Sequence, residues 1–228
     1  MRFKKFNDKT GLPEIEGPRF KRKPPLPQVA LFWGACFSFG SGDQIREVPY
    51  DPYCDYVFMG EEISMAARLY THGYDLYHPQ KMVVFHMWER HRPTFWQQFN
   101  NPSNEEHKKR RNMEKMGYER LKYLLDTPDT TTASATTTAT ATATQKNNQA
   151  IVALKASPYG LGSARTLEQY EQTIGISISK QKVFHLAGVL GLPMQSQSPD
   201  ILHRFGNWKD YKKILNSVSD TFRAHPPP

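Results

Sequence analysis

The sequence predicts an α/β domain, on three observations. Residues 29–39 form an apolar and aromatic run that is typical of a buried strand or of two short strands. Residues 60–73 place their apolar side chains three and four positions apart, which predicts an amphipathic helix. Two short apolar segments follow, 74–77 and 81–86, and Pro79 separates them as it would separate two strands. Strand, helix and strand therefore follow one another.

Three further helices are predicted around this centre. Residues 44–48 have helical composition and end at a Val-Pro step, where the proline disfavours helix at the preceding residue. Residues 105–125 are basic and carry a partial apolar face at helical spacing. A third helix is expected to start near Thr166, after a glycine-rich turn, with Tyr170 and Ile174 on one face.

Composition divides the chain of 228 residues into segments of different character. The N-terminal segment is rich in proline and glycine, which favours irregular backbone. A later tract, Thr130–Thr144, contains only small side chains and cannot repay the entropy of ordering. We therefore expect four parts: an irregular lid or loop (1–27), the main folded part (28–126), a disordered Thr/Ala-rich insertion (127–149) and a helical C-terminal extension (150–228).

The net charge of +8 favours anionic partners, which include nucleic acids and sugar nucleotides. The charge is concentrated at Arg19–Lys23 and Lys108–Arg111, and neither cluster is interleaved with aromatic residues. Nucleic-acid binding surfaces combine basic side chains with stacking aromatics, whereas the aromatics here lie in apolar runs. We therefore expect solvated charged faces and no nucleic-acid partner.

Cysteine content and hydropathy bear on the compartment. Cys36 and Cys54 lack the number and spacing of a disulfide framework or a zinc site, so they indicate thiols in a reducing compartment. No apolar stretch reaches the ~18 residues that a membrane span requires. The sequence thus predicts no transmembrane segment and a cytoplasmic location, with the Golgi as the alternative if an upstream anchor precedes these residues.

A pair of carboxylates opens the predicted helix at residues 60–73. Glu61 and Glu62 lie in its first turn, where free backbone N–H groups and the helix dipole favour negative charge. Carboxylates held in this way can orient sugar hydroxyls or exchange protons. The same pattern also arises as a plain charge pair at a helix start, and the residues alone leave both interpretations open.

Other polar residues cluster within the same part of the sequence. His86 ends an apolar segment, where a strand end can present an imidazole to a divalent metal ion, although a hydrogen-bonded structural histidine is the alternative. We expect the neighbouring polar and aromatic residues to contact substrate; these are Tyr50, Asp51, Gly60, Arg68 and Trp88.

Two blocks of the sequence resemble a known family. Residues 37–90, which contain the PYDP, GEE, ARLYTHGYDLY and HMW segments, are similar to the hydroxyproline-linked N-acetylglucosaminyltransferases, enzymes that modify the small adaptor subunit of SCF-type ubiquitin ligases. Residues 159–176 resemble the C-terminal signature of that family. Together the blocks cover about a third of the chain, and the combination is more specific than any single short motif.

The resemblance implies a fold, a reaction and site residues. Family members are retaining transferases of the GT-A fold that use UDP-N-acetylglucosamine (UDP-GlcNAc) and Mn²⁺ or Mg²⁺. By this resemblance the chain is the C-terminal, acceptor-side part of a GT-A domain, and it transfers N-acetylglucosamine (GlcNAc) to a protein hydroxyl of hydroxyproline, serine or threonine. Glu61 and Glu62 then contact the donor sugar or the acceptor as catalytic residues, and His86 ligates the metal.

One family feature has no counterpart in these residues. A GT-A enzyme carries an Asp-x-Asp metal motif at the end of its nucleotide-binding half, and no Asp-x-Asp occurs in the sequence. We therefore expect the donor-binding half to be missing from this chain, as in a truncated gene model, a fragment or a degenerate copy. The alternative to an enzyme is a non-catalytic module that keeps only acceptor recognition.

Overall fold

The computed structural model describes residues 1–17, 28–79, 84, 105–127, 154 and 157–191. Within these ranges the strands form three antiparallel sheets of two strands each: β1 with β2, β3 with β4, and β5 with β6. In chain order the elements are β1 (Arg2–Phe6), β2 (Pro13–Glu16), β3 (Gln28–Ala30), α1 (Gly42–Glu47), α2 (Glu61–Thr71), β4 (Leu76–His78), α4 (Glu105–Leu124), α6 (Leu167–Ile174), β5 (Ile176–Ser177), β6 (Lys182–Val183) and α7 (Ala187–Leu190).

This mixture of helices with small sheets agrees with the predicted α/β class. The GT-A arrangement stays a prediction, because none of the sheets in the described ranges has more than two strands. One core joins the N-terminal hairpin to α2, α4 and α6, whereas α1 has no buried residue. The boundaries proposed at residues 126 and 150 therefore do not separate independent cores.

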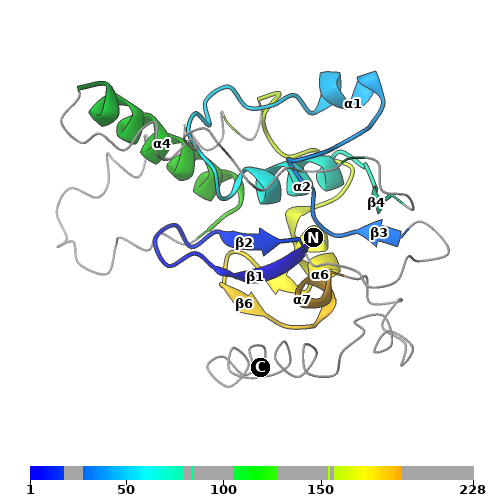
Figure 1. Ribbon diagram of the computed structural model, residues 1–228. Coiled ribbons are helices and arrows are strands. Elements are labelled where there is room, and N and C mark those ends of the chain that lie inside the picture. The colour runs from blue at the N-terminus through cyan, green and yellow to red at the C-terminus, as the bar shows by residue number, and fades with distance from the viewer. Residues whose placement is uncertain (18–27, 80–83, 85–104, 128–153, 155–156, 192–228) are drawn as a thin grey trace.

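Helix α2 lies at the centre of this core (Figure 1). Eight of its 11 residues are buried, and the predicted apolar face is confirmed for Ile63, Ala66 and Ala67. Tyr70, at the end of that face, is partly buried. The helix begins at Glu61, as predicted, and its C-terminal end contacts a loop that comes from much later in the chain.

The N-terminal segment is ordered where we expected irregular backbone. Residues 1–17 contain the hairpin β1–β2, in which Phe3 pairs with Ile15. The connecting turn is stabilised by Asn7, whose side-chain oxygen accepts hydrogen bonds from the backbone N–H groups two and three residues later, each at 2.9 Å. Gly11 supplies the positive φ that this turn needs. Gly11 and Pro13, which suggested a lid, instead lie in the turn and at the start of β2; residues 18–27 lie outside the described ranges.

The apolar run at residues 29–39 divides into a buried part and an exposed part. Residues 28–30 form β3, and Leu31, Phe32 and Trp33 are buried without further strand pairing. Residues 35–40 are exposed, and Phe39 retains 93% of its accessible surface. The prediction of a buried strand is therefore right for the first part of the run and wrong for the second.

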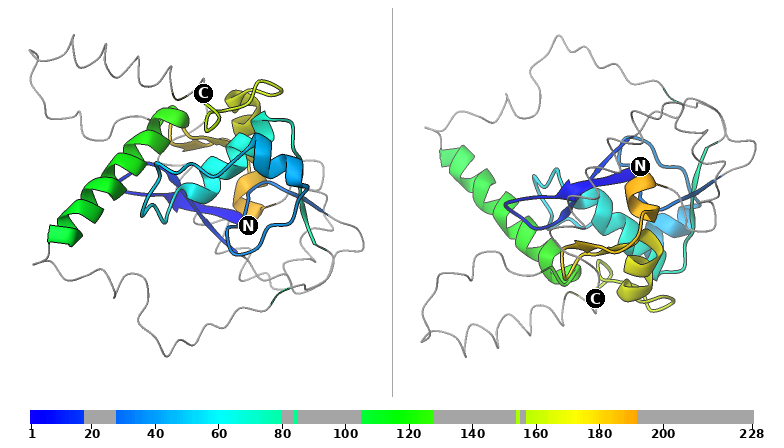
Figure 2. Two further views of the ribbon diagram at one scale, coloured as in Figure 1. Left: turned by 90° about the horizontal axis from the view of Figure 1, so that it is seen from above. Right: turned by 90° about the horizontal axis from the view of Figure 1, so that it is seen from below.

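The other predicted helices are present. Helix α1, predicted at residues 44–48, spans Gly42–Glu47 with Ser41 as its N-cap, and α6 begins after its N-cap Thr166, which forms a capping box with Gln169. The C-terminal part of helix α4 packs beside α2, and its N-terminal part extends away from it (Figure 2). Gly117 lets α4 approach the loop before α2, because a Cβ there would lie 2.6 Å from Val57 Cγ2.

We expected a helical C-terminal part, but its described residues also contain strands. Residues 176–183 form the small hairpin β5–β6, and only α7 follows it within the described residues. Helix α7 packs against β1, so residues 157–191 close the core beside the N-terminal hairpin (Figure 1). Of the second predicted strand, 81–86, only Val84 is described, and it is not in a strand; the Thr/Ala tract lies outside the described residues.

Candidate active site

The start of α2 is shaped by a glycine that no other residue replaces without strain. Gly60 is the N-cap, has φ 117° and provides no capping side chain. A Cβ at this position would lie 2.9 Å from Leu12 Cδ1 and 3.2 Å from Leu121 Cδ1. Gly60 therefore lets α2 begin against the hairpin and α4, and this places the two glutamates that follow.

Glu62 is held in a fixed orientation. Its Oε1 accepts a hydrogen bond of 2.8 Å from the backbone N–H of Ala35, in the segment that follows the buried Leu31–Trp33 stretch. Burial raises the pKa of Glu62, while this N–H acts in the opposite direction by stabilising the charged form. A carboxylate fixed in this way can orient a ligand without moving itself.

Glu61 occupies a different environment from its neighbour. Its Oε2 is buried and has no hydrogen-bond partner. Burial raises the pKa of Glu61 to about 7, and the charge of Glu62 contributes in the same direction. The pair thus combines one anchored carboxylate with one that exchanges a proton near neutral pH, and acid–base chemistry requires a group of the second kind.

The raised pKa of Glu61 predicts a pH-dependent stability. The folded protein retains this proton up to pH about 7, whereas the unfolded chain releases it near 4.5, so the free energy of unfolding falls as the pH rises through that window. Glu61→Gln cannot ionise. We expect it to unfold with a free energy about 1–2 kcal/mol larger than the native chain at pH ~8, because the partly exposed carboxylate keeps some hydration.

Urea unfolding at several pH values measures this difference in the free energy of unfolding between Glu61→Gln and the native chain. The difference should disappear by pH ~5. Glu168→Gln is the matched control, because Glu168 also lies in the first turn of a helix, α6, but is exposed. A difference of equal size at both pH values would contradict the titration of Glu61, since it would reflect packing alone.

Two of the residues predicted to contact substrate, Tyr50 and Asp51, lie in the loop before α2. Asp51 accepts a hydrogen bond of 2.5 Å from Arg120 of α4 and one of 3.0 Å from the backbone of Tyr53, and its side chain is 9% exposed. Tyr50 is 65% exposed and packs edge-on against Trp33, with ring centres 6.1 Å apart. Asp51 therefore fastens α4 to the loop before α2, and Tyr50 offers an open aromatic face.

Arg68 points away from the surface, with 2% of the residue exposed. Its guanidinium donates hydrogen bonds to the carbonyl oxygens of Gly160, at 3.3 Å, and Pro158, at 3.1 Å. Burial lowers its pKa. These bonds give Arg68 a structural role, holding the loop at residues 157–165 onto α2, while its contact with substrate stays a prediction.

The same loop covers the C-terminal end of α2. Thr71 accepts a hydrogen bond of 2.9 Å on its Oγ1 from Gly162 N–H, and its backbone oxygen accepts bonds from Ala164 and Arg165 at 3.0 and 3.1 Å. The loop thereby satisfies the last of the carbonyl groups that the helix leaves free, while His72, Gly73 and Tyr74 satisfy the others. Sequence reasoning missed this function of Thr71, Gly162 and Arg165, because the similarity of residues 159–176 to a family signature does not show what they contact.

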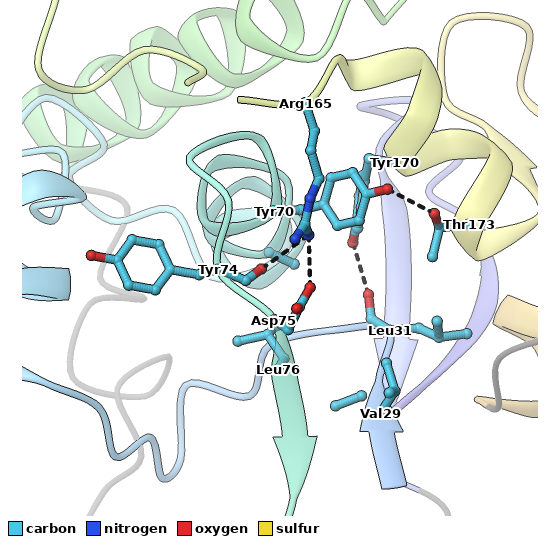
Figure 3. Close-up of a pocket in the computed structure, with 11 residues that line it drawn as sticks. Val29, Leu31, Tyr70, Tyr74, Asp75, Leu76, Arg165, Tyr170 and Thr173 are labelled. Carbon is cyan, nitrogen blue, oxygen red and sulfur yellow. Dashed lines mark hydrogen bonds and ion pairs between the residues drawn. The ribbon is translucent and has the colours of Figure 1, made fainter. Parts of the chain in front are cut away.

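A cavity of about 220 Å³ lies between α2, α6 and the β3–β4 sheet (Figure 3). We call it the α2–α6 cavity. Two aromatic rings meet on one wall, Tyr70 and Tyr170, with centres 5.3 Å apart. Arg165 lies over Tyr70, 4.6 Å from the ring centre, and pairs with Asp75 at 2.7 Å. The lining residues are Val29, Ala30, Leu31, Ala66, Tyr70, Tyr74, Asp75, Leu76, Arg165, Tyr170 and Thr173.

Comparison with protein families decides the broad class. The family model described as glycosyltransferase (GlcNAc) matches residues 1–180, a range that contains the glutamate pair, α2, the loop at its end and the cavity. The chain belongs to this family. No curated protein matches the chain, and no solved structure matches it either.

Family membership makes this GlcNAc glycosyltransferase a transferase whose ligands are a sugar nucleotide and an acceptor. The N-terminal hairpin lies within the matched range, which agrees with its place in the shared core. The specific hydroxyproline-linked subfamily is a narrower assignment than the match supports, and it belongs with the proposals below.

The described part of this GlcNAc glycosyltransferase bears on the predicted metal site only in part. Within those ranges no three side chains of His, Cys, Asp or Glu come together as a metal ion requires. His86 and Trp88 lie outside the described residues, so their placement relative to Glu62 stays a prediction. The residues described here do not by themselves form a metal site.

None of the helices in the described ranges is both long enough and apolar enough to span a bilayer.

Proposed function

We propose that this chain is the acceptor-side part of an enzyme that transfers GlcNAc from UDP-GlcNAc to the hydroxyl group of a protein, on hydroxyproline, serine or threonine. The observation that supports it most directly is the glutamate pair at the start of α2 in a member of a GlcNAc glycosyltransferase family. One carboxylate is anchored to Ala35 and the other has a free buried oxygen and a pKa of about 7. This division suits a site that must hold a sugar and also tolerate a moving proton.

In the proposed reaction the bond between the sugar C1 and the UDP oxygen breaks, and a bond from C1 to the acceptor oxygen forms. The acceptor's proton leaves with the departing diphosphate or passes to a nearby base. We assign Glu62 to orienting the sugar or the acceptor hydroxyl, because its hydrogen bond to Ala35 fixes it. Glu61 is the group that can hold a proton near neutral pH.

We also propose dependence on Mn²⁺ or Mg²⁺, with His86 as one ligand. The acceptor proposed first is the small adaptor subunit of SCF-type ubiquitin ligases, which places the reaction in the cytoplasm. Cys36 and Cys54 are both free, as in a reducing compartment, and burial raises the pKa of the Cys54 thiol to about 12, so that it is inert. The Golgi is the alternative.

The experiment supplies the full-length protein with UDP-GlcNAc carrying a radiolabelled sugar, Mn²⁺ and short peptides that differ only in carrying hydroxyproline, serine, threonine or proline at one position. We expect label on a hydroxylated peptide, none on the proline peptide, and loss of transfer after chelation with EDTA. Peptide binding without any transfer would instead favour a non-catalytic acceptor-binding module. Transfer that survives EDTA would remove the metal from the proposal.

Glu62→Gln tests the role assigned to the anchored carboxylate. The amide oxygen can still accept the hydrogen bond from Ala35, so the fold should persist while the charge is lost. We expect at least a ~10-fold fall in transfer rate, or about 1.4 kcal/mol in the barrier, with a smaller change in UDP-GlcNAc affinity measured by calorimetry. Glu168→Gln should behave as the native chain, and equal loss of affinity and rate in Glu62→Gln would contradict an orienting role.

A further inference from the structure

The α2–α6 cavity presents apolar surface to a ligand, because its polar groups already have partners. Each of the six polar or charged side chains in its lining is hydrogen-bonded within the protein. The bonds are Tyr70 with Thr173 (3.0 Å), Tyr170 with the Leu31 carbonyl (3.1 Å), Arg165 with Asp75 (2.7 Å) and Tyr74 with Glu47 (2.6 Å). Figure 3 shows the bonds of Tyr70, Tyr170 and Arg165 around the cavity, while the Tyr74 hydroxyl points away from them. Breaking such bonds costs free energy, so a sugar or a nucleotide is a poor occupant.

The volume of the α2–α6 cavity also argues against a sugar or a nucleotide as its occupant. The cavity measures about 220 Å³, whereas pockets for drug-sized ligands run from roughly 300 to 1,000 Å³. An apolar cavity of about 150 Å³ is large enough for benzene. The volume therefore suits one side chain such as phenylalanine or leucine, which would contact Val29, Leu76 and the tyrosine rings.

The cavity and Glu62 lie along the same face of α2. Glu62, Ala66 and Tyr70 are four residues apart in succession, so they share one face of the helix. The segment at residues 28–35 follows this face, since Val29–Leu31 line the cavity and Ala35 holds Glu62. Eight residues of helix span about 12 Å, which an extended peptide covers in three or four residues.

We propose that the α2–α6 cavity binds an apolar side chain of the acceptor polypeptide, three or four residues from the hydroxyl that receives the sugar. The inference rests on the proposed function, in the form in which Glu62 orients the acceptor hydroxyl. It adds a specificity site that reads the acceptor's sequence. The cavity contributes affinity through buried apolar area, and the glutamates act on the reacting groups.

A peptide series tests the position. Each glycine- and serine-free peptide contains one hydroxyproline in an alanine-rich chain and one phenylalanine that is moved along it. Binding to the full-length protein, measured by fluorescence anisotropy, should be strongest with phenylalanine three or four residues from the hydroxyproline, by about 10-fold over the all-alanine peptide. This gain corresponds to burial of one aromatic side chain, and it needs no donor sugar.

Two variants fill the cavity. Ala30→Leu adds bulk from β3, and Thr173→Leu adds it from α6; each should abolish the preference for the placed phenylalanine while leaving the all-alanine peptide bound as before. Gln172→Leu is the matched control, because Gln172 is exposed and adjacent to Thr173 but does not line the cavity. Melting curves identify any variant that fails to fold, and one folded filling variant suffices.

The outcomes separate this inference from the proposed function. Sugar transfer to hydroxyproline peptides that depends on neither the phenylalanine position nor the filling variants would overturn the cavity assignment and leave the function standing. A phenylalanine preference that the filling variants remove, in a protein that transfers no sugar, would support the cavity and count against the enzyme. A preference that survives both filling variants would place the side chain elsewhere and overturn the inference.

Discussion

Gly162→Val is expected to destabilise the protein by about 3 kcal/mol, because there is no space for a side chain at this position. A Cβ on Gly162 would lie 2.5 Å from both Thr71 O and His72 N, and backbone atoms at a helix end cannot turn aside as the tip of a flexible side chain can. The loop would have to lift from α2. That movement would also break the bond from Gly162 N–H to Thr71 Oγ1.

Urea unfolding followed by tryptophan fluorescence measures this loss. Gly42→Ala is the matched control, since a Cβ at Gly42, in the exposed helix α1, meets only Arg46 Nη1 at 3.6 Å. The control should be neutral or slightly stabilising because alanine favours helix. If Gly162→Val unfolded at the same urea concentration as the native chain, the docking of the loop on α2 would be wrong.

Arg68→Met is the second change with a large expected effect. Methionine matches most of the volume of the side chain but donates no hydrogen bonds, so the carbonyl groups of Pro158 and Gly160 lose their partner. We expect a loss of about 2–4 kcal/mol, reduced somewhat because a buried charge is also removed. Arg46→Met, at an exposed position of α1, should change the stability by less than ~0.5 kcal/mol.

This variant also distinguishes a structural role from a substrate contact. If Arg68 only holds the loop in place, the Arg68→Met variant of the full-length protein should still bind UDP-GlcNAc with native affinity at a low temperature at which it is folded. Calorimetry measures this affinity. A fall in affinity in the folded variant, out of proportion to the loss of stability, would restore the substrate contact that the sequence predicted.

The helices could be predicted because their signals are local. Apolar spacing identified α2, and the capping residues Ser41 and Thr166 mark starts that depend on neighbours three residues away. The N-terminal hairpin was missed for a related reason. Glycine and proline counts indicate breaks in regular structure, and they do not distinguish a loop from a tight turn between two short strands.

The position of the two glutamates at the start of α2 could be predicted, but their environment could not. The sequence places Glu61 and Glu62 at a helix start, yet the contrast between them comes from the Ala35 N–H that Glu62 accepts and from the burial of Glu61. Arg68 has no local signal for its partners, which follow it by about 90 residues. Contacts of this range depend on the whole fold, so one sequence without its structure does not reveal them.

The distance along the chain between α2 and its loop also has a consequence for biosynthesis. Thr71 meets Gly162 across a separation of 91 residues, so the loop that covers the end of the helix cannot dock until that later segment leaves the ribosome. At about 5–20 residues per second, translation takes roughly 5–20 s to cover this stretch. For that interval the central helix lacks its C-terminal cover, and the nascent chain exposes apolar surface that a chaperone can bind.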